Sequence, residues 1–150
     1  MIRDGLEVVA SLHEASQRWE RPYDLEACVR RWNADVSFSL GRAGAPNDLF
    51  VFYEELTSRP EATLRRLLAG LGLGWEPEVL EGYARTSRRL ITEQEGWKED
   101  VGRRIHRSAT SGRALTAEQR DRAMRSLRRG LYDELLDRDG STSAATGGTG

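Results

Sequence analysis

Near the start of the chain, an arginine, an aspartate and a serine are spaced so that side chains among them can bind a phosphate group. Arg3 follows Met1-Ile2, which resembles the end of a strand, and Ser11 comes eight positions later in a segment with helical periodicity. Open α/β sheets bind ligands where strands end, and the next helix offers N–H groups and a positive dipole end. An arginine fork bonds phosphate through two donors, and a serine hydroxyl adds one. Alternatively, Arg3 pairs with Asp4 or a neighbouring acid, and Ser11 is an ordinary small helix residue.

Composition narrows the class of protein. The chain has 150 residues, of which 38% are apolar and 31% charged, as expected for about one globular domain. A net charge of −1 disfavours a general nucleic-acid or membrane-surface binder. The single cysteine, Cys28, cannot form an internal disulfide or a zinc site, which predicts a cytoplasmic protein without a metal. We find neither a membrane-spanning run nor a signal-peptide pattern.

The basic residues are unevenly distributed. Of the 23 basic residues, 22 are arginine, and residues 85–129 hold 13 basic against 6 acidic groups. Genome base composition explains the arginine preference in general. The local excess nevertheless favours an anion site, because the planar guanidinium suits phosphate and sulfate.

Periodicity and capping residues predict mostly helices. We expect a helix over residues 4–18 with Asp4 as N-cap, a second from Asp24, a third from Pro60 to Gly72 and a short one near Pro77. The second helix should bury a single face, formed by Leu25, Cys28, Val29, Trp32 and Val36. A capping box of Thr116 and Gln119 should open one last helix that carries Met124, Leu127, Leu131 and Leu135 on one face.

Residues 49–53, LFVFY, form a short apolar run that is typical of a strand buried on both faces in a parallel sheet. Such a strand needs neighbours on both edges, because unpaired buried backbone groups are costly. The chain offers no other convincing strand. The sequence therefore predicts the C-terminal part of a larger α/β domain over residues 1–138, mostly helical within this chain, and a disordered tail over 139–150.

Four segments, taken in order, resemble the family of sulfotransferases that use 3′-phosphoadenosine 5′-phosphosulfate (PAPS), in its bacterial form. They are RDGLEVVAS (3–11), FYEEL followed by RPEATLRRL (52–67), LGLGW (71–75) and LTAEQ (115–119). The resemblance covers about residues 2–136 and implies the three-layer parallel sheet of a P-loop-type domain. It also implies transfer of a sulfuryl group from PAPS to a hydroxyl or amine.

The resemblance assigns cofactor-binding roles to four residues. Arg3 and Ser11 match the family's 3′-phosphate motif, and Tyr53 matches a tyrosine near the adenine. Arg107, with Arg104 as a second candidate, lies in a stretch that loosely resembles the basic loop over the 3′-phosphate. Tyr53 could equally be a core aromatic, and the arginines could belong to a solvated basic loop.

Two parts of the family pattern are absent from this sequence. No glycine-rich P-loop turn occurs, and the family's catalytic histidine lies upstream of the Arg-Asp motif, so neither His13 nor His106 matches it. We therefore assign no catalytic residue. We therefore expect that the sequence is a fragment, that it was given a late start codon, or that it is a degenerate paralogue.

In each case we expect the chain to carry half of a PAPS site and to be inactive in isolation. The resemblance implies that the acceptor is a small molecule, a carbohydrate or a peptide. The alternatives are a non-catalytic helical interaction module and a degenerate nucleotide-binding protein.

Overall fold

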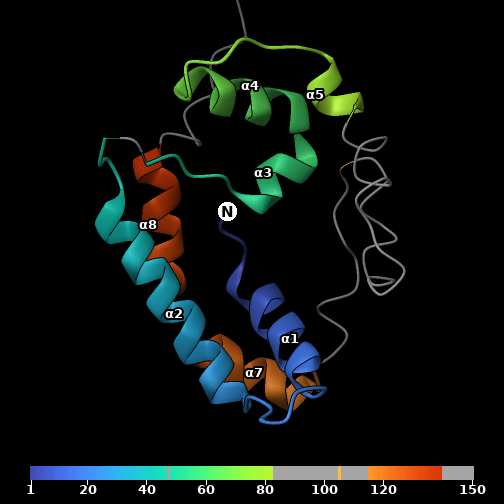
Figure 1. Cartoon of the computed structure of the whole chain (residues 1–150). Coiled ribbons are helices and arrows are strands. Elements are labelled where there is room, and N and C mark those ends of the chain that lie inside the picture. Colours follow the sequence, from blue (N-terminus) through green and yellow to red (C-terminus); the bar gives the residue numbers. More distant parts are fainter. Residues whose placement is uncertain (47, 83–104, 106–114, 140–150) are drawn as a thin grey trace, which may run out of the picture. The chain divides into compact units, whose positions relative to one another are not determined.

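The computed structural model describes residues 1–46, 48–82, 105 and 115–139, which fall into two compact units. Residues 1–50 and 108–150 form the first unit, and residues 51–107 form the second. The first unit contains α1 (Gly5–Ser16), α2 (Leu25–Arg42), α7 (Ala117–Ser126) and α8 (Arg129–Asp139); the second contains α3 (Tyr53–Ser58), α4 (Pro60–Gly70) and α5 (Glu78–Glu81) (Figure 1). Within the described ranges, no strand exceeds a single bridge residue. None of the described helices is long and apolar enough to cross a membrane.

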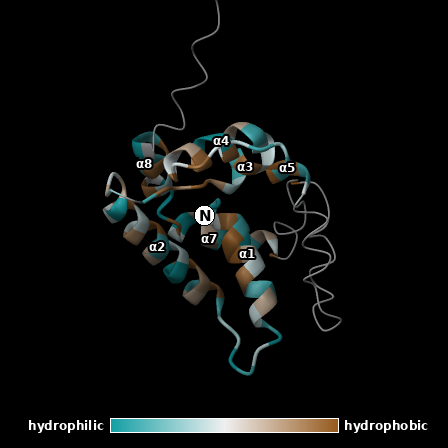
Figure 2. Cartoon of the chain, turned by 45° about the horizontal axis from the view of Figure 1, so that its top comes forward, coloured by the Kyte–Doolittle hydropathy of each residue, from teal (hydrophilic) through white to brown (hydrophobic). Residues whose placement is uncertain are grey.

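Helix α2 is the centre of the first unit, where it contacts α1, α7 and α8 (Figure 1). Asp24 caps it by accepting the N–H of Ala27 at 2.6 Å. The predicted buried face is confirmed, since all five of its residues are buried: Leu25, Cys28, Val29, Trp32 and Val36. Burial raises the pKa of the Cys28 thiol, and the nearby charge of Asp24 adds to this shift. Hydrophobic and hydrophilic segments alternate along α2, as in an amphipathic helix (Figure 2).

The start of α1 packs very closely against α2. Asp4 is the N-cap, as predicted, and Gly5 is the first helical residue. A Cβ atom at Gly5 would lie 2.9 Å from Cε2 of Trp32 and 2.9 Å from Cδ2 of Leu127. The Trp32 indole N–H donates to the Arg3 carbonyl at 3.1 Å. Glycine at position 5 therefore lets the backbone lie against the indole ring.

The expected last helix is divided into α7 and α8, so the prediction of one continuous helix is wrong. Its capping box is confirmed at Thr116 and Gln119. The helix ends at Ser126 because Leu127 takes an extended conformation, with φ −72° and ψ 129°, in which it is buried. The Asn33 amide bonds both groups exposed by this break: it donates to the Ser126 carbonyl at 3.0 Å and accepts the Arg128 N–H at 2.9 Å.

The second unit begins where a strand was expected. Residues 49–51 have no regular structure, only Phe52 forms a bridge, and Tyr53 is the first residue of α3. The predicted strand over 49–53 is therefore wrong for most of its length. Two carboxylates in the first turn, Glu54 and Glu55, favour a helix start at this point.

The end of α4 follows the sequence expectation. Gly72 has a φ of +70°, which glycine adopts without strain. The N–H of Gly72 donates to the Ala69 carbonyl at 3.0 Å, and the N–H of Leu73 donates to the Leu68 carbonyl at 2.8 Å. This pair of bonds is a Schellman motif and ends the helix. The short helix α5 then starts after Pro77, also as predicted.

Gly5→Ala is expected to destabilise the first unit. The new methyl group must displace Trp32 or Leu127, and overpacking of this kind costs about 1–3 kcal/mol. Gly41→Ala is the matched control, because a Cβ there meets nothing within 4 Å and alanine favours a helix by about 0.5–1 kcal/mol. Urea unfolding should show a lower midpoint for the first variant and an equal or higher midpoint for the second. Equal midpoints for both variants would contradict the close packing.

Asn33→Ala is expected to loosen the corner between α7 and α8. It leaves two backbone groups without their amide partner, at a cost of about 1–2 kcal/mol, near the low end because the corner is partly solvated. Amide hydrogen exchange at Arg128 should accelerate in this variant. Asn33→Asp keeps the acceptor, so Arg128 should stay protected although the donor to Ser126 is lost. Fast exchange in both variants would show that the Asn33 oxygen does not hold this corner.

Candidate functional site

Two of the predicted site residues lie at the start of α1: Arg3 directly precedes the N-cap Asp4, and Ser11 lies within the helix. Glu7 lies between them, four positions from each. Residues four apart in a helix are neighbours on its surface, about 6 Å apart along the axis. Ser11 is exposed, and Arg3 and Glu7 are partly exposed. Ser11 is thus one helical turn beyond Glu7, and the Arg3 guanidinium approaches Ser11 only through its contact with the Glu7 carboxylate.

The first turn of α1 already uses some of its N–H donors. The Asp4 side chain accepts the N–H of Leu6 at 3.0 Å and that of Glu7 at 3.2 Å. We expected this helix to offer free backbone donors to an anion, and for these two groups that expectation is wrong. The reason is local, because an N-cap carboxylate satisfies the donors that a ligand would otherwise take.

Both the backbone and the side chain of Arg3 make contacts. Its carbonyl accepts the Trp32 indole N–H, and its Nη2 donates to Oε2 of Glu7 at 3.1 Å. The side chains of Arg3 and Glu7 are 21% and 25% exposed, so both remain accessible from solvent. The alternative considered from sequence, a pairing of Arg3 with a neighbouring acid, therefore occurs, and the partner is Glu7.

The other two predicted residues are not part of this cluster as described. Tyr53 belongs to the second unit, where it is half-buried and its carbonyl accepts the Thr57 hydroxyl at 2.8 Å. Arg107, Arg104 and His106 lie outside the described residues. His13 packs against the loop after α1, with Nδ1 3.2 Å from the Tyr23 carbonyl. This contact ties the imidazole ring to the loop, as expected for a histidine that packs against its neighbours.

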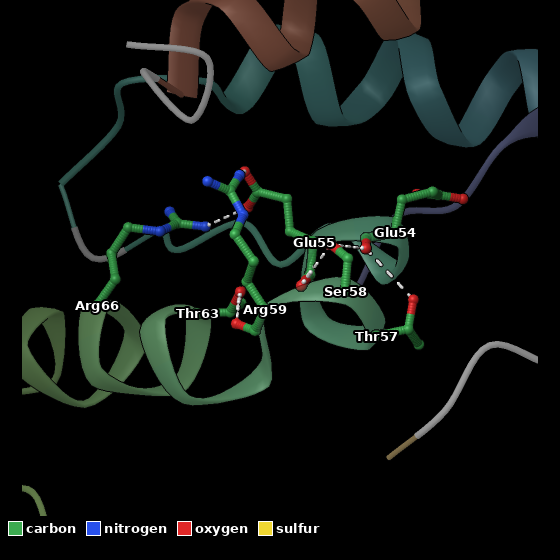
Figure 3. Close-up of polar contacts among 7 residues, drawn as sticks. All are labelled: Glu54, Glu55, Thr57, Ser58, Arg59, Thr63 and Arg66. Atoms are coloured by element: carbon green, nitrogen blue, oxygen red, sulfur yellow. Dashed lines mark hydrogen bonds and ion pairs between the residues drawn. The ribbon is translucent and has the colours of Figure 1, made fainter. Parts of the chain in front are cut away.

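Glu55 organises the second unit, a role that sequence reasoning missed. Its carboxylate lies 3.1 Å from Nη2 of Arg66 and 3.7 Å from Nη2 of Arg59 (Figure 3). Only 15% of the Glu55 side chain is exposed, against 41% and 53% for the two arginines. The contact joins α3 to α4 across 11 positions. The i, i+4 spacing of Glu55 and Arg59 was the signal available in the sequence.

Hydroxyl groups bond back to the backbone around Glu55. Ser58 donates to the Glu54 carbonyl at 2.7 Å, and Thr63, which is buried, donates to the Arg59 carbonyl at 2.9 Å (Figure 3). These bonds satisfy the hydroxyl groups within α3 and at the start of α4, neither of which has a side-chain N-cap bond. Glu55 of the YEEL segment thus has a structural use, because its carboxylate joins α3 to α4.

A cavity of about 210 Å³ lies between α2 and α7, away from the α1 cluster. Leu25, Val29 and Ala123 form its apolar part, and it also contains Arg122, which contacts Glu26. Asn33 lines it as well, with its amide already bonded at the α7–α8 corner. Its polar groups are thus largely engaged with one another. Within the described ranges, no three His, Cys, Asp or Glu side chains gather as a metal site needs.

One carboxyl elsewhere in the first unit has a shifted pKa. Arg42 Nε donates to Oδ2 of Asp48 at 2.7 Å, and this bond lowers the pKa of Asp48 below its usual value. The pair joins the end of α2 to the turn that follows it. It stabilises that turn above the ordinary aspartate pKa, and the contribution is lost as the pH falls through the lowered value.

Comparison with known proteins gives one informative relative. The chain is 33% identical over 85 residues to protein-tyrosine sulfotransferase A of Caenorhabditis elegans, a match that covers 53% of this chain and 22% of that protein. This chain therefore spans well under two thirds of the curated relative that it matches. No family model matches the chain, and no solved structure matches it. The match supports a sulfotransferase relationship, in agreement with the resemblance inferred from the motifs.

Glu55→Gln is expected to weaken the packing of α3 on α4. Neutralising a carboxylate that is mostly shielded from water removes its attraction to two guanidinium groups, at a cost of about 1 kcal/mol after screening at the exposed arginines. Glu61→Gln is the control, because its pair with Arg65 is half exposed on both sides and should contribute about 0.5 kcal/mol or less. Thermal unfolding followed by circular dichroism compares the two. An equal shift in both variants would show that Glu55 is an ordinary surface charge.

Proposed function

We propose that this chain is part of a sulfotransferase that uses PAPS, and that it carries the half of the cofactor site that binds the 3′-phosphate. The observation that carries the proposal is the pairing of a sulfotransferase relative with the Arg3–Ser11 arrangement on α1. Neither would be sufficient alone. An arginine just before a helix and a serine within it are common, and a match over 85 residues identifies no ligand.

The residues at the start of α1 offer donors that fit a phosphate group, and an acidic residue, Glu7, already bonds one of them. Arg3 supplies a fork of N–H donors, and Ser11 supplies a hydroxyl one turn beyond Glu7. Glu7 bonds the same guanidinium that the phosphate would use. A phosphate monoester carries more negative charge than one carboxylate, so it can compete for Arg3.

When bound, PAPS supplies the sulfuryl group. In this chain, Arg3 and Ser11 would anchor the nucleotide by its 3′-phosphate and thereby fix its orientation, which is a large part of catalysis in group transfer. Tyr53 would lie near the adenine and Arg107 would close over the phosphate, as the family resemblance implies. No residue of this chain is assigned as the catalytic base.

The printed name of the relative directs the choice of acceptor. That protein is a protein-tyrosine sulfotransferase, so a tyrosine hydroxyl in a peptide is the first acceptor to test. The complete enzyme is proposed to have the parallel sheet of a P-loop-type domain, to which this chain contributes mainly helices.

A second candidate, a helical interaction module, is favoured by one observation. Leu71 and Leu73, two positions apart after the end of α4, are each 57% exposed, and neighbouring exposed apolar side chains can form a contact surface for a partner. An interaction module would not distinguish nucleotides by their 3′-phosphate, so the experiment below separates the two candidates.

Arg3→Ala is expected to weaken binding of adenosine 3′,5′-bisphosphate by this chain, measured by calorimetry. One charge-assisted contact to phosphate contributes about 1.5–3 kcal/mol. The backbone bond from Trp32 remains, so the fold should be retained. Arg3→Lys should recover part of the affinity, because an ammonium lacks the fork. Ser11→Ala should cost about 1 kcal/mol, since it removes one neutral donor.

Two controls make the experiment specific. Adenosine 5′-phosphate lacks the 3′-phosphate and should bind the wild type and Arg3→Ala equally. Arg30→Ala removes the same charge from an exposed position on α2 and should leave both affinities unchanged. If Arg3→Ala binds the bisphosphate as tightly as the wild type does, the assignment of Arg3 to the 3′-phosphate is wrong.

A further inference from the structure

We propose that Glu7 is a positioning residue of the Arg3 anion site, which holds the guanidinium against α1 until a phosphate displaces it. The inference rests on the proposed function, since it concerns the same site. It assigns a role to a residue that the motif resemblance leaves without one. It also predicts that removal of an acidic side chain improves ligand binding and at the same time weakens the fold.

The ion pair has the geometry of an exchangeable contact. Nη2 of Arg3 lies 3.1 Å from Oε2 of Glu7, and both side chains are between a fifth and a quarter exposed. Their i, i+4 spacing keeps the two groups adjacent without any long-range packing. Both side chains still reach solvent, so an incoming anion can approach the guanidinium and compete with the carboxylate for it.

The backbone of Arg3 is fixed independently of Glu7. The Trp32 indole N–H bonds the Arg3 carbonyl, and Gly5 packs against the same ring. Exchange of Glu7 for a phosphate therefore leaves these backbone contacts in place. The first turn of α1 need not unfold.

Glu7 also occupies the position between the two proposed phosphate ligands. Ser11 follows it by one helical turn, so a phosphate that contacts both Arg3 and Ser11 must lie over Glu7. The carboxylate then repels the ligand in addition to competing for the guanidinium. Both effects lower the affinity and both disappear when Glu7 is neutral.

The fold and the ligand make opposite demands on this residue. For the fold, Glu7 is favourable, because a carboxylate in the first turn of a helix interacts with the positive end of the dipole and pairs with Arg3. For an anion at the same place it is unfavourable. A residue with a purely structural role would change stability and affinity in the same direction.

The test measures binding of adenosine 3′,5′-bisphosphate to the full chain by calorimetry, together with the melting temperature. Glu7→Gln should bind about two- to fivefold more tightly than the wild type, the factor that corresponds to an exposed ion pair. Its melting temperature should fall slightly. Glu7→Asp restores the charge and should return the affinity toward that of the wild type.

Two further variants show whether the effect acts through Arg3. Glu14→Gln removes the same charge from an exposed position two turns along α1, about 10 Å away, and should change the affinity little at 0.1 M salt. Glu7→Gln made in the Arg3→Ala background should give much less gain than in the wild type, as a double-mutant cycle requires for coupled residues.

The outcomes separate this inference from the proposed function. If Arg3→Ala weakens binding but Glu7→Gln leaves it unchanged or weakens it further, the site exists and the role of Glu7 is wrong. An equal gain from Glu14→Gln, or an undiminished gain in the Arg3→Ala background, would also overturn that role in favour of a general charge effect. If the wild type does not bind the bisphosphate, or binds it independently of Arg3, the proposed function fails and the inference fails with it.

Discussion

The contact of the Trp32 ring with the backbone at Arg3 and Gly5 is the constraint on which the first unit depends. The indole N–H bonds the Arg3 carbonyl, and the ring lies so close to Gly5 that no side chain fits there. Leu127 reaches the same point from the corner between α7 and α8, and the Tyr132 ring lies 6.3 Å from that of Trp32. One buried tryptophan thus fixes three segments of the chain. Among them is the backbone from which the Arg3 side chain extends.

Features that depend on neighbouring residues were predictable from the sequence. The buried face of α2 follows from its period, and the caps at Asp4, Asp24 and Thr116 follow from side chains that reach their own helix. The break at Leu127 was not predictable, because the amide that satisfies it belongs to Asn33, more than 90 positions away. The strand predicted over residues 49–53 was wrong for a different reason, because a short apolar run does not by itself distinguish a strand from the segment that leads into a helix.

In the candidate site, some features follow from the residue spacing and others depend on side-chain conformation. The positions of Glu7 and Ser11 one turn apart on α1, and of Arg3 just before its N-cap, follow from the sequence. The use of the first N–H groups by Asp4 and the pairing of Arg3 with Glu7 depend on which side-chain conformations are adopted. The residue spacing allows the Asp4 cap and the Arg3–Glu7 pair, but it does not determine whether they form. A sequence motif therefore identifies the groups that can meet a ligand, and the structure identifies what those groups bond in the absence of one.

Polar groups at the start of α1 already bond one another, and this has a consequence for the energetics of any anion that binds there. A charge-assisted bond from Arg3 contributes about 1.5–3 kcal/mol, but a bond to Glu7 worth up to about 1 kcal/mol is given up for it. The remaining gain is modest when set against the entropy lost on association. The α1 site is therefore suited to orienting one end of a larger ligand whose affinity comes mainly from other contacts. A nucleotide with a second charged end, bound by further parts of an enzyme, has that character, and an isolated inorganic anion does not.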